Sequence, residues 1–310
     1  MKNSSLIQKL GPFFGLILIT VVLAFLSPSF LDLNNILNIL RQVSINALIA
    51  FGMTFVILTG GIDLSVGSML ALGAALTAGA MTSGIDPILA MMVGLLAGAA
   101  MGAFNGVVIT KGRVAPFIAT LATMTIYRGL TLVYTEGRPV TGLSDGYAFQ
   151  LIGKGYFLGI PVPVITMFGA FAFLWFLLKK TTFGRGVYSV GGNEEASRLA
   201  GLRVDRIKIG VYTLTGMLSV MAGIILTSRL NSAQPTAGTA YELDAIAAVV
   251  LGGTSLTGGR GWIFGTFIGV LIIGVLNNGL NLLNVSSFYQ QVVKGGVILL
   301  AVILDRKKAA

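Results

Sequence analysis

Amide and hydroxyl side chains are scattered through the apolar stretches of this 310-residue chain. Such groups offer hydrogen-bond donors and acceptors without a strong electric field, which suits a neutral, polyhydroxylated solute. The alternative is that they hydrogen-bond one helix to another, as is common in membrane bundles. The candidates for lining a solute pathway, two carboxylates among them, are Asn46, Thr54, Asp63, Ser65, Asn105, Asp244, Asn277, Asn278, Tyr289 and Gln290.

Groups for acid–base or covalent chemistry are scarce. The chain has no Cys and no His, which excludes thiolate catalysis and removes the commonest general base and metal ligand. The main charged residues within apolar stretches are Arg128, Asp244 and Lys294. Each lies near the end of its stretch, where a long side chain can reach the surface. No series of carboxylates indicates a proton relay, so a proton pump and an intramembrane enzyme are disfavoured.

The phosphate-binding pattern G-x-x-x-x-G-K-[ST] does not occur in the chain. The only Gly-Lys pair is Gly153-Lys154, and Gly155 follows it. The chain is therefore not expected to bind ATP by that route.

Residues 179–208 form the one long polar stretch in the sequence. Asn193 suits an N-cap, Glu194 and Glu195 suit a first helical turn, and Gly201 suits the position just past a helix end. These signals predict a helix of about two turns, over residues 194–200. Its small apolar face consists of Ala196, Leu199 and Ala200, with Glu194 and Arg198 expected at the rim. Such a helix is shaped to dock onto a partner, and the alternative is an ordinary loop that orients the protein.

Composition places these residues in a membrane protein. Only 10% of residues are charged, 55% are hydrophobic, and the mean hydropathy is +0.89. A soluble domain carries about 25% charged residues. The chain is therefore expected to be an all-α polytopic membrane protein that forms a single domain over residues 1–310. Since a spanning helix needs about 20 apolar residues, ten spans are expected, at roughly 10–27, 40–59, 66–83, 88–109, 116–134, 161–178, 208–228, 242–253, 262–283 and 288–304.

Several details of this topology follow from the same pattern. The start MKNSSLIQKL resembles that of a signal peptide, but no A-x-A site follows, so an uncleaved first span is expected. Residues 31–38 are expected to be a short amphipathic approach to the second span, and 135–160 a longer polar loop. The eighth span is short. If it only re-enters the membrane without crossing it, the sides assigned to the segments after it are wrong.

Alternating spans place most of the 21 Lys and Arg residues on one side, together with both termini and the stretch 179–208. The positive-inside rule makes that side the cytoplasm. The net charge of +10 then indicates orientation and contact with anionic lipid rather than nucleic acid.

Small residues recur every four positions in two expected spans. Gly94, Gly98, Gly102 and Gly106 do so in one, and Gly67, Ala71, Ala75 and Gly79 in the other. Such ridges let helix backbones pack closely. There is also a short internal echo, in which Gly60-Gly61-x-x-Leu64-Ser65 matches Gly252-Gly253-x-x-Leu256-Thr257. Transporters often contain repeats with broken helices at matching positions, although chance is a serious competitor in a glycine-rich chain.

Five segments of the sequence carry a resemblance to a known family. They are ILTGGIDLSVGSMLAL (57–72), KGRVAPFIATL (111–121), GGNEEASRLAGLRVDRIKI (191–209), SAQPTAGTAYELDAIAAVVLGGTSLTGG (232–259) and GVLNNGLNLLNVSSFYQQVVKG (274–295). They resemble the permease subunits of bacterial ABC sugar importers, and ribose importers most closely. Permeases for xylose, galactose or autoinducer-2 share much of the pattern.

The resemblance implies a function and a set of partners. The chain would be a multi-pass permease of the bacterial inner membrane that passes a monosaccharide, D-ribose, into the cell. Its partners would be a second copy of the permease, a cytoplasmic ABC ATPase and a periplasmic or lipid-anchored sugar-binding protein. ATP and Mg would bind the ATPase, and this chain would bind no cofactor or metal. The coupling residues would be Gly191, Gly192, Asn193, Glu194, Glu195, Ala196, Arg198, Leu199, Ala200 and Gly201.

The competing hypothesis is a self-sufficient secondary carrier or channel. It needs a site for a coupling ion, for which Asp63 and Asp244 are the candidates.

Overall fold

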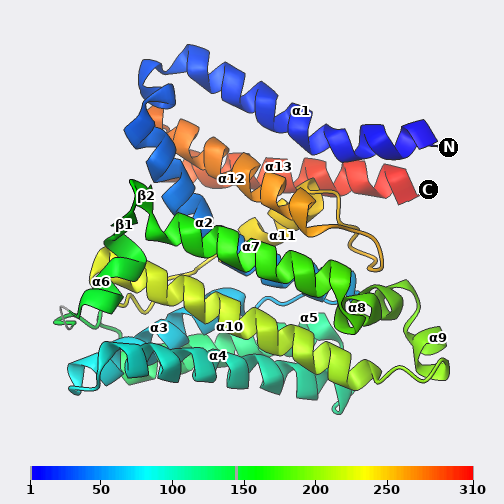
Figure 1. Cartoon of the computed structure of the whole chain (residues 1–310), viewed down its shortest axis with the longest axis horizontal. Coiled ribbons are helices and arrows are strands. Elements are labelled where there is room, and N and C mark those ends of the chain that lie inside the picture. The colour runs from blue at the N-terminus through cyan, green and yellow to red at the C-terminus, as the bar shows by residue number, and fades with distance from the viewer. Residues whose placement is uncertain (1, 144–145, 310) are drawn as a thin grey trace.

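The computed structural model describes the backbone of residues 2–143 and 146–309, and the side chains of 11–143, 146–297 and 299. This part of the chain is a bundle of helices with one short hairpin (Figure 1). The first half consists of α1 (Lys2–Leu26), the 3-10 turn η1 (Pro28–Leu31), α2 (Leu33–Leu58), α3 (Val66–Thr82), α4 (Pro87–Thr110), α5 (Pro116–Thr135) and α6 (Tyr147–Lys154). The second half consists of β1 (Tyr156–Phe157), β2 (Ile160–Pro161), α7 (Val162–Lys180), α8 (Thr182–Gly192), α9 (Glu194–Leu199), α10 (Val204–Leu230), α11 (Tyr241–Leu251), α12 (Ile263–Leu282) and α13 (Ser287–Ala309).

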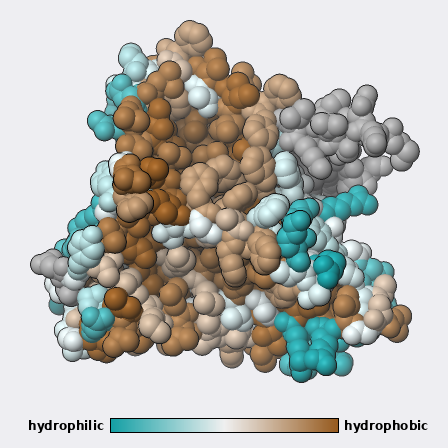
Figure 2. All heavy atoms as spheres, in the orientation of Figure 1, coloured by the Kyte–Doolittle hydropathy of each residue, from teal (hydrophilic) through white to brown (hydrophobic). Residues whose placement is uncertain are grey.

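Helices α2, α10 and α12 form the centre of the bundle. In their most apolar stretches 78%, 61% and 72% of residues are buried, against 28% in each of α4, α5 and α7. The outer helices therefore expose apolar side chains. Figure 2 shows such side chains across much of one face, with hydrophilic residues gathered toward its two ends. This distribution is typical of a bundle surrounded by lipid.

Glycines allow α4 to lie directly against α10. A Cβ added to Gly102 would stand 2.1 Å from the carbonyl oxygen of Tyr212, and one added to Gly216 would stand 2.2 Å from the carbonyl oxygen of Gly98. The backbones are therefore in contact, with no room for a side chain between them. The close packing predicted from the glycine ridge of α4 is confirmed.

The chain between α10 and α12 passes through the bundle in two parts. Residues 231–240 are mostly irregular, and the Arg128 guanidinium donates to the carbonyl oxygens of Pro235 at 2.7 Å and Ala237 at 2.9 Å. Arg128 is half-buried, so the sequence-based expectation that its side chain reaches the surface stays a prediction. Helix α11 follows with 11 residues, a length of about 16 Å. The expected eighth span, 242–253, thus coincides with this short helix, and the irregular stretch lies before it. Together they take the chain from one end of the bundle to the other between α10 and α12 (Figure 1).

Two helix breaks meet at the end of the bundle that carries α8. Gly60 follows α2 with φ of 77°, and Gly253 follows α11 with φ of 83°, both in the left-handed region that favours glycine. The Gly259 N–H donates to the carbonyl oxygen of Leu58 at 3.0 Å, which ties the second break to the end of α2. The two copies of the sequence echo therefore lie side by side. A relation by internal repeat stays a prediction.

Each of the ten expected spans coincides with a helix. Six of these helices, α2, α4, α5, α7, α10 and α12, are long and apolar enough to cross a membrane, and α1 and α3 contain shorter apolar stretches. Ten complete crossings therefore stay a prediction. In Figure 1 the N and C marks lie at the same end of the bundle as α9.

Two expectations about the connections were wrong. Residues 31–38 are not a separate approach, because α2 runs without a break from Leu33 to Leu58. The expected loop 135–160 contains α6 and β1. The β1–β2 hairpin is missed because both strands have only two residues, too few to show an alternating pattern.

The contact between α4 and α10 predicts a large difference between glycine substitutions. We expect Gly102→Ala to destabilise the protein by about 1–3 kcal/mol, because the new methyl group must push α4 away from the α10 backbone. Gly169→Ala in α7 is the control, since nothing lies within 4 Å of its added Cβ. Thermal unfolding of the purified chain in detergent would measure both. Equal midpoints for the two variants would contradict the packing described here.

Candidate functional site

The polar stretch 179–208 folds into two short helices, where the sequence predicted only one. Helix α8 begins after Thr181, whose hydroxyl oxygen accepts a hydrogen bond from the Gly184 N–H at 3.2 Å. The glycines of α8 lower its helix propensity, so the sequence pattern does not predict a helix there. The signals that do identify it are the capping Thr181 and the apolar positions Phe183, Val187 and Val190.

Helix α9 forms where the sequence predicted it. The Asn193 side-chain oxygen accepts a hydrogen bond from the Ala196 N–H at 2.9 Å, so the predicted N-cap is confirmed. Gly201 has φ of 83°, which confirms its place just past the helix end. The helix ends at Leu199, one residue earlier than expected.

Hydrogen bonds hold α9 on α8, and α8 in turn lies on the central bundle. The buried Ser197 hydroxyl contacts the Ser189 hydroxyl at 3.0 Å. A Cβ on Gly191 would overlap the carbonyl oxygen of Leu58, so α8 ends directly against the end of α2. The Tyr188 hydroxyl donates to the Gly261 carbonyl oxygen at 2.8 Å. Burial raises the pKa of this phenol, so it remains a protonated donor.

The apolar face of α9 points away from the rest of the chain. Leu199 is 84% exposed, and Ala196 and Ala200 beside it are exposed as well. The contact of this face with a partner stays a prediction.

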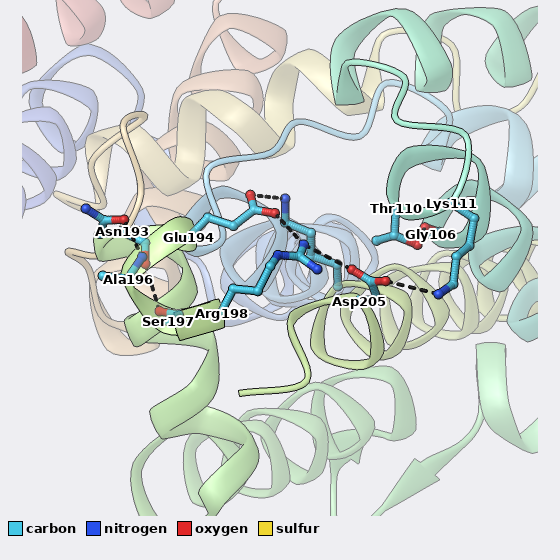
Figure 3. Close-up of polar contacts among 10 residues, drawn as sticks. Gly106, Thr110, Lys111, Asn193, Glu194, Ala196, Ser197, Arg198 and Asp205 are labelled. Carbon is cyan, nitrogen blue, oxygen red and sulfur yellow. Dashed lines mark hydrogen bonds and ion pairs between the residues drawn. The ribbon is translucent and has the colours of Figure 1, made fainter. Parts of the chain in front are cut away.

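Glu194 and Arg198 form ion pairs with α10. Glu194 pairs with Lys208 of α10 and, at 3.4 Å, with Arg198. Arg198 also pairs with Asp205 of α10 at 3.2 Å (Figure 3). Both side chains stay about half exposed, at 43% for Glu194 and 56% for Arg198. Their expected place at the rim of the apolar face therefore stays a prediction.

At the other end of the bundle, three of the predicted pathway residues line one cavity. The cavity has a volume of about 330 Å³ and lies among α2, α10, α11, α12 and α13. The three are Asn46, Asp244 and Asn277. Sequence reasoning did not select the remaining lining residues as pathway candidates, although it noted Lys294 as a charged residue within an apolar stretch. They are Gln42, Ile45, Leu226, Arg229, Leu230, Tyr241 and Lys294.

Two of the three charged side chains in this cavity pair with each other, and the third, Arg229, donates to the side-chain oxygen of Asn38 at 3.3 Å. The Lys294 ammonium donates to the Asp244 carboxylate at 3.1 Å. The amides of Gln42, Asn46 and Asn277 then provide neutral donors and acceptors. A second hollow of about 300 Å³ along residues 234–239 shares Tyr241, Leu226 and Leu230 with the first.

Another three predicted pathway residues form a buried cluster that does not line this cavity. The Asp63 carboxylate accepts hydrogen bonds from the Ser65 N–H at 2.9 Å and the Ser65 hydroxyl at 2.6 Å. The Asn105 amide donates to the Ser65 hydroxyl oxygen at 2.8 Å. All three residues are fully buried. Their geometry fits the alternative reading from the sequence, in which polar groups join helices, and here they join the α2–α3 break to α4.

The last four predicted pathway residues lie outside the cavity. Thr54 shares a 2.8 Å hydrogen bond with Thr266, and the amide of Asn278 donates to Asn35 at 2.8 Å. The Gln290 amide donates to Asn281 at 2.8 Å. Tyr289 is 69% exposed. Side-chain type alone does not separate these positions from those that line the cavity.

Metal-binding groups are not gathered in the part of the chain that the structure describes. Within it, no three His, Cys, Asp or Glu side chains lie close enough together to hold a metal ion.

Comparisons with known proteins agree on a transport family. A family model described as "Branched-chain amino acid transport system / permease component" matches residues 35–302. The ribose import permease protein RbsC of Bacillus subtilis is 68% identical over 303 residues, 98% of this chain and 94% of the relative. RbsC of Haemophilus influenzae is 55% identical, covering 98% of this chain and 97% of the relative. The D-allose transport system permease protein AlsC of Escherichia coli is 45% identical, covering 96% of this chain and 92% of the relative.

No solved structure matches the chain. The family model and the relatives each cover nearly all of the described bundle, from α2 through most of α13. The chain therefore belongs to the family of bacterial ABC importer permeases, which includes the ribose import permeases that it resembles.

Proposed function

We propose that this chain is the permease subunit of an ATP-driven importer that carries D-ribose across the bacterial inner membrane. The observation that carries the proposal is 68% identity to a ribose import permease over 98% of the chain. The cavity lined by Gln42, Asn46 and Asn277 supports it, because amides can replace the water around a sugar hydroxyl.

The proposed orientation places α9 and both termini in the cytoplasm. They lie at one end of the bundle (Figure 1), and Lys and Arg residues are concentrated there in the sequence. The cavity then opens toward the outside, because it lies at the last turn of α10, whereas α9 precedes the first turn. A helix of 27 residues separates the two by about 40 Å.

The proposed partners follow from this orientation. Helix α9 presents Ala196, Leu199 and Ala200 to a separate ATPase, which holds ATP and Mg. A sugar-binding protein delivers substrate at the opposite end, and a second copy of the permease completes the passage. Gly191, Gly192 and Asn193 position the helix for this contact, and Glu195 lies on its exposed side.

Within the chain, the cavity is the proposed passage for sugar. Its amides bind the solute weakly enough for it to leave again. The secondary-carrier alternative gains no support from the relatives, which are ribose and D-allose permease proteins. Of its two candidate ion ligands, Asp244 is paired with Lys294.

Transport should depend entirely on the ATPase. In proteoliposomes that contain the permease, its ATPase and its binding protein, we expect ribose uptake only with ATP. Uptake that persists without the ATPase, driven by an ion gradient, would overturn the proposal in favour of a secondary carrier.

The exposed face of α9 should be required for coupling. We expect Leu199→Asp to reduce ribose-stimulated ATP hydrolysis by about tenfold. The partner buries the Leu199 side chain, which stabilises the complex by about 1.5–3 kcal/mol, and the variant places a charge at that position. The thermal midpoint of the permease alone should not change, since Leu199 is 84% exposed there. Leu199→Met is the control and should retain coupling. Wild-type stimulation of hydrolysis in the Asp variant would remove α9 from the interface.

The cavity amides should matter for uptake. We expect Asn277→Leu to lower the ribose uptake rate about tenfold, because it removes one or two hydrogen bonds of about 1 kcal/mol each. Thr54→Val is the control, because it removes a hydrogen bond to Thr266 outside the cavity. Uptake is measured with assembled complexes of equal amount. If Asn277→Leu transports like wild type while Thr54→Val does not, the cavity is not the passage.

A further inference from the structure

A network of ion pairs joins α9 to two other parts of the bundle (Figure 3). Glu194 pairs with Lys208, Glu194 with Arg198 at 3.4 Å, Arg198 with Asp205 at 3.2 Å, and Asp205 with Lys111 at 3.1 Å. Lys111 follows α4, whereas Asp205 and Lys208 lie in the first turns of α10. We call these five residues, Lys111, Glu194, Arg198, Asp205 and Lys208, the ion-pair network.

The network matters because little else fixes α9. The structure describes all six residues of α9, and among them only Ser197 is buried. An apolar core therefore does not hold the helix in place. Apart from the hydrogen bonds of Ser197 and the chain connections at each end, its link to the bundle is electrostatic.

Asp205 is the junction of the network. Its carboxylate accepts from Lys111 on one oxygen and from Arg198 on the other. Helix α10 lies in the centre of the bundle, with its backbone against that of α4. Asp205 thus connects the exposed helix α9 to a helix whose backbone contacts that of α4.

We propose that the ion-pair network is the mechanical link that makes α9 move together with α10 and the end of α4, with Asp205 as its positioning residue. The proposal rests on the proposed function, in which α9 receives the motion of the ATPase. The pairs are partly exposed, with side-chain exposures from 14% for Lys208 to 67% for Lys111. Such pairs are individually weak and are screened by salt, so the link is sensitive to ionic strength.

Spin labels can test the link in the permease alone. The chain has no Cys, so Leu199→Cys and Phe117→Cys place single labels on α9 and α5, both at exposed positions. In lipid nanodiscs at 0.15 M salt we expect one narrow distance distribution. Asp205→Asn should broaden it at least twofold, and 1 M salt, with a Debye length of about 3 Å, should broaden the wild-type distribution in the same way.

Arg206→Gln is the control for this measurement. Arg206 adjoins Asp205, is exposed, and has no ion pair among the described residues. Its loss changes the local charge by one unit but should leave the distribution narrow. Equal widths for wild type, Asp205→Asn and wild type at 1 M salt would overturn the proposal.

In the assembled importer the same variant should separate hydrolysis from transport. We expect Asp205→Asn to lower the number of sugars imported per ATP about fivefold, in line with the loss of two exposed pairs, while hydrolysis continues. Asp205→Glu should restore the ratio, and Lys111→Gln should give a smaller loss. An unchanged ratio in Asp205→Asn would refute the link and leave the proposed function intact.

Failure of the proposed function has a different signature. If the wild-type importer shows no ATP-dependent uptake, the function is wrong, whatever the spin labels report. A narrow distribution that broadens in Asp205→Asn would then still show that the network holds α9 in place.

Discussion

Contact between the backbones of α4 and α10 is the interaction on which the other arrangements depend. Gly98, Gly102 and Gly216 leave no side chain between the two helices. The contact fixes the position of α10, against which α2 and α3 also pack. Both candidate functional regions are attached to this helix, since α9 precedes its first turn and the cavity lies at its last. Two distant sites therefore share one rigid element.

Polar groups inside the bundle are placed where backbone groups need partners. Residues 231–240 are mostly irregular, and carbonyls released from helical pairing need partners where a membrane interior does not solvate them. Arg128 binds two of these carbonyls, and Asp63 binds the backbone and hydroxyl of Ser65. Some polar side chains of the chain thus bind irregular backbone, and only the others are available to bind a solute.

The sequence predicts local features well and the use of polar side chains poorly. The N-cap at Asn193, the glycine after α9 and the ridge of α4 were all predicted, because each depends on a few neighbouring residues or on one helical period. Helix α8 was missed because its glycines obscure that period. Asn277 and Asn278 are adjacent in sequence, yet one lines the cavity and the other binds Asn35. That difference is set by the rotation of α12 against its neighbours, which no local pattern encodes.

The short helix α11 has a consequence for how the protein is made. A segment enters the bilayer on its own when it offers about 20 apolar residues, and α11 has 11, preceded by an irregular stretch. Residues 231–262 therefore contain no helix long enough to span the membrane by itself. They must be accommodated by helices already in place, among them α5, which carries Arg128. Helix α5 is synthesised before residues 231–262. Arg128 is therefore present before the carbonyl groups that it binds.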